Sequence, residues 1–254
     1  MLIVSCEVQA ANSRKKGAHK KRASQGLLRV LAHPEAYPVV IGNQSYRKSR
    51  KKLKLPAWKN THEVSKAFAS HQAILNMRDK GYIPVKLSIN LNDKYTAKLH
   101  PINRGELKDP LGSVRDLIRK AVVEQFGDCP VYFYLALHDV AGSPKEFGGK
   151  PRIRPHLHGL LAVPPHKGTL TAAMASLEDA IKRKVASKYR EYGRNRAVEV
   201  SDRWGRRGKV QKVINLGWYD YIFSGSKSYF IGPIATSQEL TREAERLWLE
   251  WRRR

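Results

Sequence analysis

The alternation of hydrophobic and polar residues becomes regular at about residue 61 and predicts a helix followed by a strand. Over residues 61–80, apolar side chains recur at helical spacing, with Thr61 placed to cap the start and Gly81 placed to end the helix. Over residues 82–91, apolar side chains occupy every second position, which is typical of a strand with one buried face. A globular domain therefore begins near this point.

A second helix and two further strands follow. Asp109 is placed to cap a helix that carries proline in its first turn and ends at Gly127. Residues 131–139 are rich in aromatic and β-branched side chains, and residues 153–163 end in an apolar run, so both ranges predict strands. A glycine-containing loop joins these two strands, as in an antiparallel pair.

The rest of the pattern predicts one more strand and three more helices. The strand covers residues 196–201. The first of the helices begins at Thr169 or Thr171 and ends at about Tyr192. The second covers residues 213–223, and the third covers residues 237–254. This order of elements indicates an α+β fold with a mainly antiparallel central sheet and flanking helices.

Residues 1–60 lack such a pattern and are strongly basic instead. Their only acids are Glu7 and Glu35, whereas Lys and Arg form clusters such as residues 47–52. Basic clusters of this kind contact phosphates without reading a sequence. We therefore expect a basic, partly flexible extension over residues 1–60, a globular domain over residues 61–235 and a basic C-terminal helix over residues 236–254.

Composition narrows the classes of function. The net charge of +26 favours a polyanionic partner and argues against an acidic small molecule as the sole partner, although a ribosomal protein would also suit it. Cys6 and Cys129 are too few for a disulfide framework or a zinc–thiolate site. With no apolar run of membrane-spanning length and no signal-like start, we expect a cytoplasmic protein without a membrane partner.

A pair of histidines at the third strand is the most distinctive chemical feature. Side chains alternate across a strand, so His156 and His158 project from one face, about 7 Å apart along the chain. Two imidazoles in this arrangement can hold two positions of a metal ion. Leu160 and Leu161 stand where a histidine-triad hydrolase or a metallo-β-lactamase-type site needs His or Asp, and no glutamate follows as in a cupin.

The preceding strand offers a third ligand. Its apolar residues share one face, and His138 belongs to the other. If the two strands pair antiparallel, His138 can join His156 and His158 on the accessible face. Asp139 is the alternative, because a bulge at the strand end could turn it to that face. We favour His138, because alternation places it there without a bulge.

These residues resemble the metal-binding motif of the HUH endonucleases, the single-strand nicking enzymes of rolling-circle replication, conjugation and some transposition. The resemblance covers residues 82–227 and has the order of the replication-initiator (Rep) type, in which a tyrosine follows the histidines. It implies a ferredoxin-like or RRM-like core and a divalent ion, magnesium or manganese, held by His156, His158 and His138 or Asp139. It also implies a tyrosine nucleophile that becomes covalently linked to DNA.

The resemblance places this nucleophile on a helix within residues 216–227. Tyr221 follows Trp218 at the family's spacing and is preferred, while the alternative, Tyr219, lies about 200° away around a helix. The lysine that closely follows the tyrosine in the family is matched only by Lys227. Basic residues that could grip the DNA backbone are Arg152, Arg154, Lys209 and Lys212.

We therefore expect a metal-dependent, site-specific single-strand DNA endonuclease and strand transferase that initiates rolling-circle replication of a plasmid or phage through a 5′-phosphotyrosine. The alternatives are a mobilisation relaxase or transposase with the same chemistry, and a non-catalytic, basic nucleic-acid-binding protein. The expected partners are single-stranded DNA at a replication origin and a host polymerase. A host helicase is expected too, because the sequence holds no Walker-type phosphate loop.

Overall fold

The structure of the protein is a computed structural model that describes most of the chain from residue 55 onward and two short strands before it. The described residues are 39–41, 44–46, 55–90, 109, 111–140, 156–188, 197–205, 211–223 and 229–253. In the described part no helix is long and apolar enough to cross a membrane.

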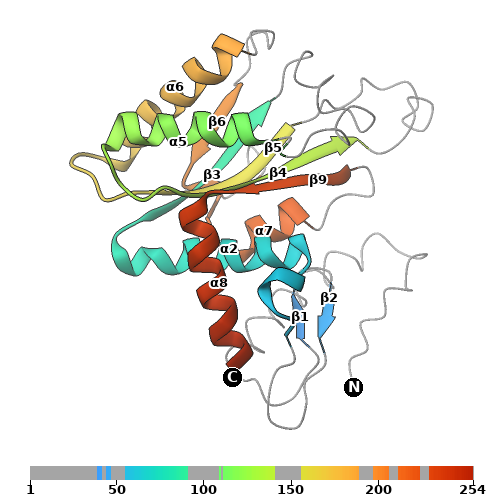
Figure 1. The fold of residues 1–254 in the computed structure, drawn as a ribbon. Helices are drawn as coiled ribbons and strands as arrows, with labels where there is room; N and C mark the ends of the chain where they lie inside the picture. Colours follow the sequence, from blue (N-terminus) through green and yellow to red (C-terminus); the bar gives the residue numbers. More distant parts are fainter. Residues whose placement is uncertain are drawn as a thin grey trace.

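A five-stranded antiparallel sheet forms the centre of the fold (Figure 1). Its strands lie in the order β6-β3-β5-β4-β9, and each neighbouring pair is antiparallel. The strands are β3 (Ile83–Asn90), β4 (Tyr132–Val140), β5 (His156–Val163), β6 (Val198–Ser201) and β9 (Tyr229–Thr236). Together with the helices on both faces, this sheet confirms the predicted α+β fold class.

Helices cover both faces of the sheet, so the fold has three layers (Figure 1). One face packs on α5 (Gly112–Phe126) and α6 (Leu170–Lys188), and this interface forms an aliphatic core. The opposite face packs on α2 (Glu63–Asn76), α7 (Leu216–Phe223) and α8 (Gln238–Arg253), where the core is rich in aromatic side chains. Burial of both faces excludes water from the middle of the sheet, as hydrophobic stabilisation requires.

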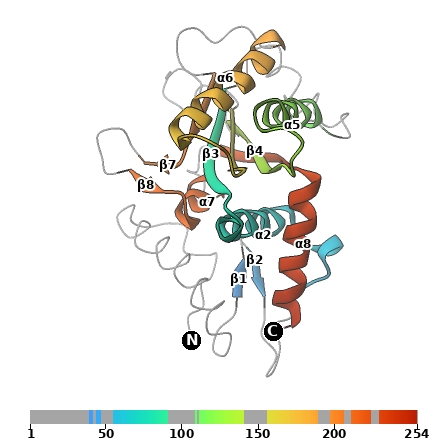
Figure 2. The ribbon, with the colours of Figure 1, turned by 90° about the vertical axis from the view of Figure 1, so that its left-hand side faces the viewer.

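Short elements complete the described part. Single-turn 3-10 helices cover Trp58–Asn60 and Met77–Lys80, the second of which extends α2. The strands β1 (Val39–Ile41) and β2 (Gln44–Tyr46) pair with each other, as do β7 (Arg203–Trp204) and β8 (Lys212–Val213). In Figure 2 the β7–β8 pair lies beside α7.

The predicted alternation in the strands is confirmed. In β4, Phe133, Leu135 and Leu137 belong to the core against α5 and α6, whereas Tyr134 and Ala136 belong to the core on the opposite face. Period-two alternation therefore decides which residues of each strand meet which helical layer.

Two of the expected helix caps are wrong. The first helix begins at Glu63, and the Nδ1 atom of His62 accepts from Val64 N at 3.2 Å, while the hydroxyl of Thr61 donates to the Ala57 carbonyl at 3.0 Å. The second helix begins at Gly112 after Leu111, which has no capping side chain. The Asp109 carboxylate instead pairs with Arg115 at 2.7 Å, an ion pair that still places negative charge near the helix start.

Other boundaries are as expected. Gly81 follows α2 and its 3-10 extension with a φ of 80°, a left-handed conformation that favours glycine. The hydroxyl of Thr169 accepts from Ala172 N at 3.3 Å, which identifies Thr169 rather than Thr171 as the cap of α6. The cap of α8 is Ser237, whose Oγ accepts from Leu240 N at 3.4 Å.

Several features differ from the expectation. The helix expected over residues 213–223 begins at Leu216, because Val213 belongs to β8. The β1–β2 pair, the β7–β8 pair and the edge strand β9 were not expected. In β9 the residues Gly232 and Pro233 argue against a strand, but its pairing with β4 is irregular between Ala136 and His138, and proline is tolerated at an edge or bulge.

Candidate metal centre and neighbouring tyrosine

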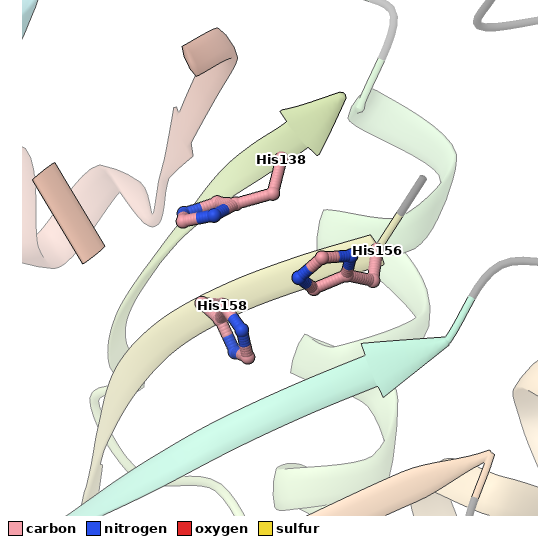
Figure 3. A group of neighbouring side chains, drawn as sticks. All are labelled: His138, His156 and His158. Carbon is pink, nitrogen blue, oxygen red and sulfur yellow. The ribbon is translucent and has the colours of Figure 1, made fainter. Parts of the chain in front are cut away.

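The three histidines lie on adjacent strands and on the same side of the sheet. In the β4–β5 pair, His138 stands directly opposite His156, and His158 follows two residues later on β5 (Figure 3). Residues directly opposite each other in an antiparallel pair project from the same face, so register alone brings the third ring to the other two.

The ligand atoms of His138, His156 and His158 all lie within 4.8 Å of one another. Their ring centroids are 4.7 to 5.3 Å apart. Two imidazole nitrogens bound to one ion at about 2.1 Å can stand at most about 4.2 Å apart, so small side-chain rotations would bring all three onto a single ion. The donor set and its spacing therefore fit a divalent metal.

Two histidines of this cluster, His138 and His158, are held in the neutral form. Burial, together with the neighbouring His156, lowers the pKa of His138 to about 3. Burial is also the main cause that lowers the pKa of His158 to about 2, and unfavourable electrostatic interactions of the protonated ring with His156, His138 and Lys86 lower it further. A neutral imidazole keeps the lone pair that a metal needs, so no proton has to be displaced at neutral pH.

Ser88 orients one of these rings. It stands opposite His158 in the β3–β5 pair, and its Oγ lies 2.9 Å from His158 Nδ1. If Nδ1 carries the proton and donates to Ser88, the Nε2 atom is the one left to bind a metal. Beside Ser88 on the same face of β3, Lys86 forms an ion pair with Glu199 of β6 at 2.9 Å.

Helix α7 brings a tyrosine to the edge of the histidine cluster. The indole N–H of Trp218 donates to the carbonyl of Gly159, the residue after His158, at 2.9 Å. Tyr221, one turn further along, stacks on Trp218 with a centroid distance of 5.0 Å and an interplanar angle of 12°. The Tyr221 ring also lies 5.5 Å from the His158 ring and remains 53% exposed. A substrate in solvent can therefore reach this tyrosine beside the histidines.

Tyr219 occupies the opposite side of α7. It is buried, and its hydroxyl donates to the Val64 carbonyl of α2 at 3.1 Å. Its ring packs edge-on against Phe68 and His71. The packing and the hydrogen bond give Tyr219 a place in the core, away from the histidine cluster.

The start of α7 is fixed by partly buried hydrogen bonds from α2 and its extension. His71 Nε2 lies 3.1 Å from the Asn215 carbonyl, and His71 Nδ1 lies 2.8 Å from the hydroxyl of Tyr134. Arg78 donates to the Ile214 carbonyl at 2.6 Å. The side chain of Asn215 accepts from Gly217 N at 2.8 Å and so caps the helix. These contacts hold the helix that carries Tyr221 at a defined position relative to β5.

Several residues named from the sequence lie outside the described residues: Arg152, Arg154, Lys209 and Lys227. Asp139 belongs to β4 and pairs with Phe230 of β9, but its side chain also lies outside the described part. Lys212 lies in β8, with its ammonium 5.8 Å from the centre of the Trp204 ring.

Two residues beside the histidines, Ser88 and Trp204, were not predicted from the sequence. Ser88 lies on the polar face of the strand expected over residues 82–91. A known register between that strand and the histidine strand would have identified Ser88 as the partner of His158. Trp204 gave no signal, since the two-residue strand that carries it is too short to read from alternation.

Comparisons with known proteins add a distant fold likeness. No protein-family model matches the chain, and no curated protein matches it. Among solved structures, the chain is similar to the catalytic domain of the Adeno Associated Virus type 5 Rep protein at 14% identity and a TM-score of 0.36, over 66% of this chain and 97% of that chain. A likeness this distant does not assign the chain to a family, so its function has to be inferred from the side chains of the site.

Proposed function

We propose that this protein is a metal-dependent, site-specific single-strand DNA endonuclease and strand transferase of the rolling-circle replication-initiator type. The observation that carries the proposal is the contact between the exposed Tyr221 ring and the ring of His158, which belongs to a cluster of three histidines. A nucleophile and an electrophilic metal beside each other are the two parts that transfer of a phosphoryl group to a protein side chain requires.

The chemistry assigned to Tyr221 is a reversible exchange of phosphoesters. Its phenolic oxygen attacks the scissile phosphorus and loses its proton, and the bond from phosphorus to the 3′-oxygen breaks. The 3′-oxygen takes up a proton, while the 5′ end of the strand remains attached to the tyrosine. Because a phenol ionises near pH 10, phenolate is a good leaving group, and a 3′-hydroxyl can later reseal the strand.

His138, His156 and His158 would hold the divalent ion, which would offset the charge that develops on the phosphate oxygens. The chain's own contribution is to keep the rings of His138 and His158 neutral and to fix the orientation of His158 through its contact with Ser88. An all-imidazole donor set suits manganese or another transition ion better than magnesium, which prefers oxygen ligands.

We assign DNA binding to the basic residues of the chain. The net charge of +26 supports a strong, salt-dependent attraction to the phosphate backbone. Lys212 is the described member of this group, and Arg152, Arg154, Lys209 and Lys227 are proposed members, with residues 1–60 as a basic extension. Single-stranded DNA at an origin would be the substrate, and a host helicase and polymerase would act on the product.

The decisive experiment compares the two tyrosines of α7. The protein is incubated with manganese and a random-sequence pool of single-stranded oligonucleotides, and covalent adducts are separated on a denaturing gel and mapped by fragmentation mass spectrometry. Tyr221→Phe keeps the ring and its stacking on Trp218, so we expect it to lose the adduct while retaining the fold. Tyr219→Phe is the matched control and should still form the adduct. An adduct that persists in Tyr221→Phe would refute the assignment.

A second experiment tests the metal site apart from cleavage. Calorimetric titration with manganese should give about one site per chain in the wild type and strongly weakened binding in His158→Ala. His138→Ala should lose affinity as well, because it removes one of three donors. Unchanged affinity in His138→Ala would transfer the third-ligand role to another group such as Asp139.

A further inference from the structure

Three aromatic side chains from two segments pack together beside the histidine cluster, and Tyr221 is the exposed member of the group. We call Trp204, Trp218 and Tyr221 the aromatic platform. The centroid of the Trp204 ring lies 6.2 Å from that of Trp218 and 6.4 Å from that of Tyr221. Trp204 comes from the β7–β8 hairpin, which Figure 2 shows beside α7. Two elements that are not sheet neighbours therefore contribute to one aromatic group.

The position of Trp204 is fixed by the backbone of α7. A Cβ atom added at Gly217 would lie 2.5 Å from Cζ2 of the Trp204 ring, so only glycine leaves room for the indole at this point. Trp204 is half-buried, and its ring is oriented before any ligand arrives. A pre-oriented ring stacks on a ligand at a lower entropic cost than a mobile one.

Apolar surface is exposed at this place and carries positive charge. Tyr221 is 53% exposed, and it is one of the three large hydrophobic side chains that are exposed in the described part of the chain. The Lys212 ammonium lies 5.8 Å from the centre of the Trp204 ring, and that of Lys86 lies 6.0 Å from the centre of the Trp218 ring. An exposed tyrosine beside a half-buried indole, with an ammonium group over each indole ring, suits a ligand that is both planar and anionic.

The sequence of the hairpin adds charge of the same sign. Residues 203–212 contain five Lys and Arg residues and no acid. A sugar–phosphate backbone is the partner that such a segment favours, and an unpaired base is the planar group that a half-buried indole can stack on. Paired bases cannot fill this role, because both faces of each base are already stacked in the duplex.

We propose that the aromatic platform binds an unpaired base of single-stranded DNA on Trp204, with Lys212 on a neighbouring phosphate. This inference rests on the proposed function and deepens it, because it identifies the residues that would seat the strand next to Tyr221. Trp204 is then a positioning and specificity residue: its stacking fixes the phosphate that Tyr221 meets, while the basic extension supplies affinity that does not depend on bases.

The first test measures binding without metal or cleavage. In EDTA, fluorescence anisotropy compares an oligothymidylate of roughly 20 nucleotides with an abasic strand of equal length, both longer than one site of this type. Trp204→Leu keeps apolar packing but removes the stacking ring, so we expect about tenfold weaker binding of the oligothymidylate and no change for the abasic strand. Trp204→Phe restores a stacking ring and should recover most of the affinity.

A matched pair of lysine variants tests the phosphate contact. Lys66 lies 5.9 Å from the centre of the Trp58 ring, so it reproduces the Lys212–Trp204 arrangement away from the histidine cluster. Lys212→Gln and Lys66→Gln remove the same charge. Only Lys212→Gln should lower the salt dependence of oligothymidylate binding, by about 0.7 in the log–log slope for one phosphate contact on a single strand.

The proposal is overturned if Trp204→Leu binds the oligothymidylate as the wild type does, or weakens binding of both strands equally. Photocrosslinking of the wild type to a bromodeoxyuridine-substituted strand gives an independent answer that does not require a folded Trp204 variant. Crosslinks in residues 203–223 support the platform, and crosslinks confined to other peptides refute it. Because these measurements need no cleavage, a protein that binds as expected but forms no tyrosine adduct would refute the proposed function and leave the platform intact.

Discussion

His71 should make the stability of the fold sensitive to mild acid. It lies in the core between α2 and the start of α7, and burial lowers its pKa to about 3 from the ordinary value of 6.5. The Asn215 carbonyl can only accept a hydrogen bond, so Nε2 carries the proton and Nδ1 accepts from the Tyr134 hydroxyl. A second proton on Nδ1 would compete with that hydroxyl for the same bond.

The sign and size of the effect follow from linkage. Because the pKa is lower in the folded state, the unfolded state binds more protons below pH 6.5, and stability falls as pH drops from 6.5 toward 3. With those two pKa values, a single histidine costs about 2 kcal/mol between pH 7 and pH 5. His138 and His158 titrate in the same direction and add their own losses.

The variant His71→Gln isolates this contribution. Its amide can still donate to the Asn215 carbonyl but does not titrate, while the other two histidines are unchanged. Urea unfolding in EDTA, measured at pH 7 and pH 5, should show a loss of stability about 2 kcal/mol smaller in the variant than in the wild type. Ser70→Ala, a buried neighbour on the same helix, is the control and should lose as much as the wild type. Equal losses in His71→Gln and the wild type would refute the reasoning.

Three further predictions concern the metal centre, the sheet and the basic extension. Ser88→Ala removes the partner of His158 Nδ1 and should weaken manganese binding about tenfold in calorimetry, with little change in melting temperature. Gly159→Ala would place a Cβ 2.0 Å from the Tyr134 carbonyl, so it should lower the unfolding free energy by more than about 3 kcal/mol or prevent folding, as circular dichroism would report. Deletion of residues 1–36 should reduce the salt dependence of single-strand binding while leaving adduct formation intact, whereas loss of the adduct from the folded truncation would place those residues in the active site. That truncation ends before Leu55, whose side chain is buried and whose carbonyl accepts from Arg252 of α8.

The faces of the central strands could be predicted from the sequence because their side chains alternate with a period of two and one face is more apolar than the other. In β4 this periodicity separates Leu135 and Leu137 from Ala136 and His138, and the observed pairing then sets His138 opposite His156. A single slip in register would move His138 to the other face, so the burial of the leucines protects the geometry of the histidine cluster.

The contacts that refine the site could not be predicted, because they depend on registers between distant segments. Ser88 meets His158 through a pairing of strands 70 residues apart, and Trp218 meets the Gly159 carbonyl across 59 residues. Neither contact leaves a local pattern. The edge strand β9 was hidden for a different reason, since its glycine and proline oppose strand propensity and only pairing with β4 compensates for them.

The histidine cluster lies at the edge of the sheet face that α2 and α7 cover. Along that face of β5, Ala162 and Leu160 are buried beneath α2 and α7, and His158 and His156 follow as the strand reaches partial exposure. A polar group on this face needs either a partner or a ligand, and the half-exposed end is the part where a ligand can enter. Tyr219 and Tyr221 lie on different sides of α7, because residues two positions apart on a helix point in different directions. Tyr219 is therefore buried against Phe68, while Tyr221 faces solvent beside His158. The same packing that buries one side of α7 therefore presents the candidate nucleophile on the other.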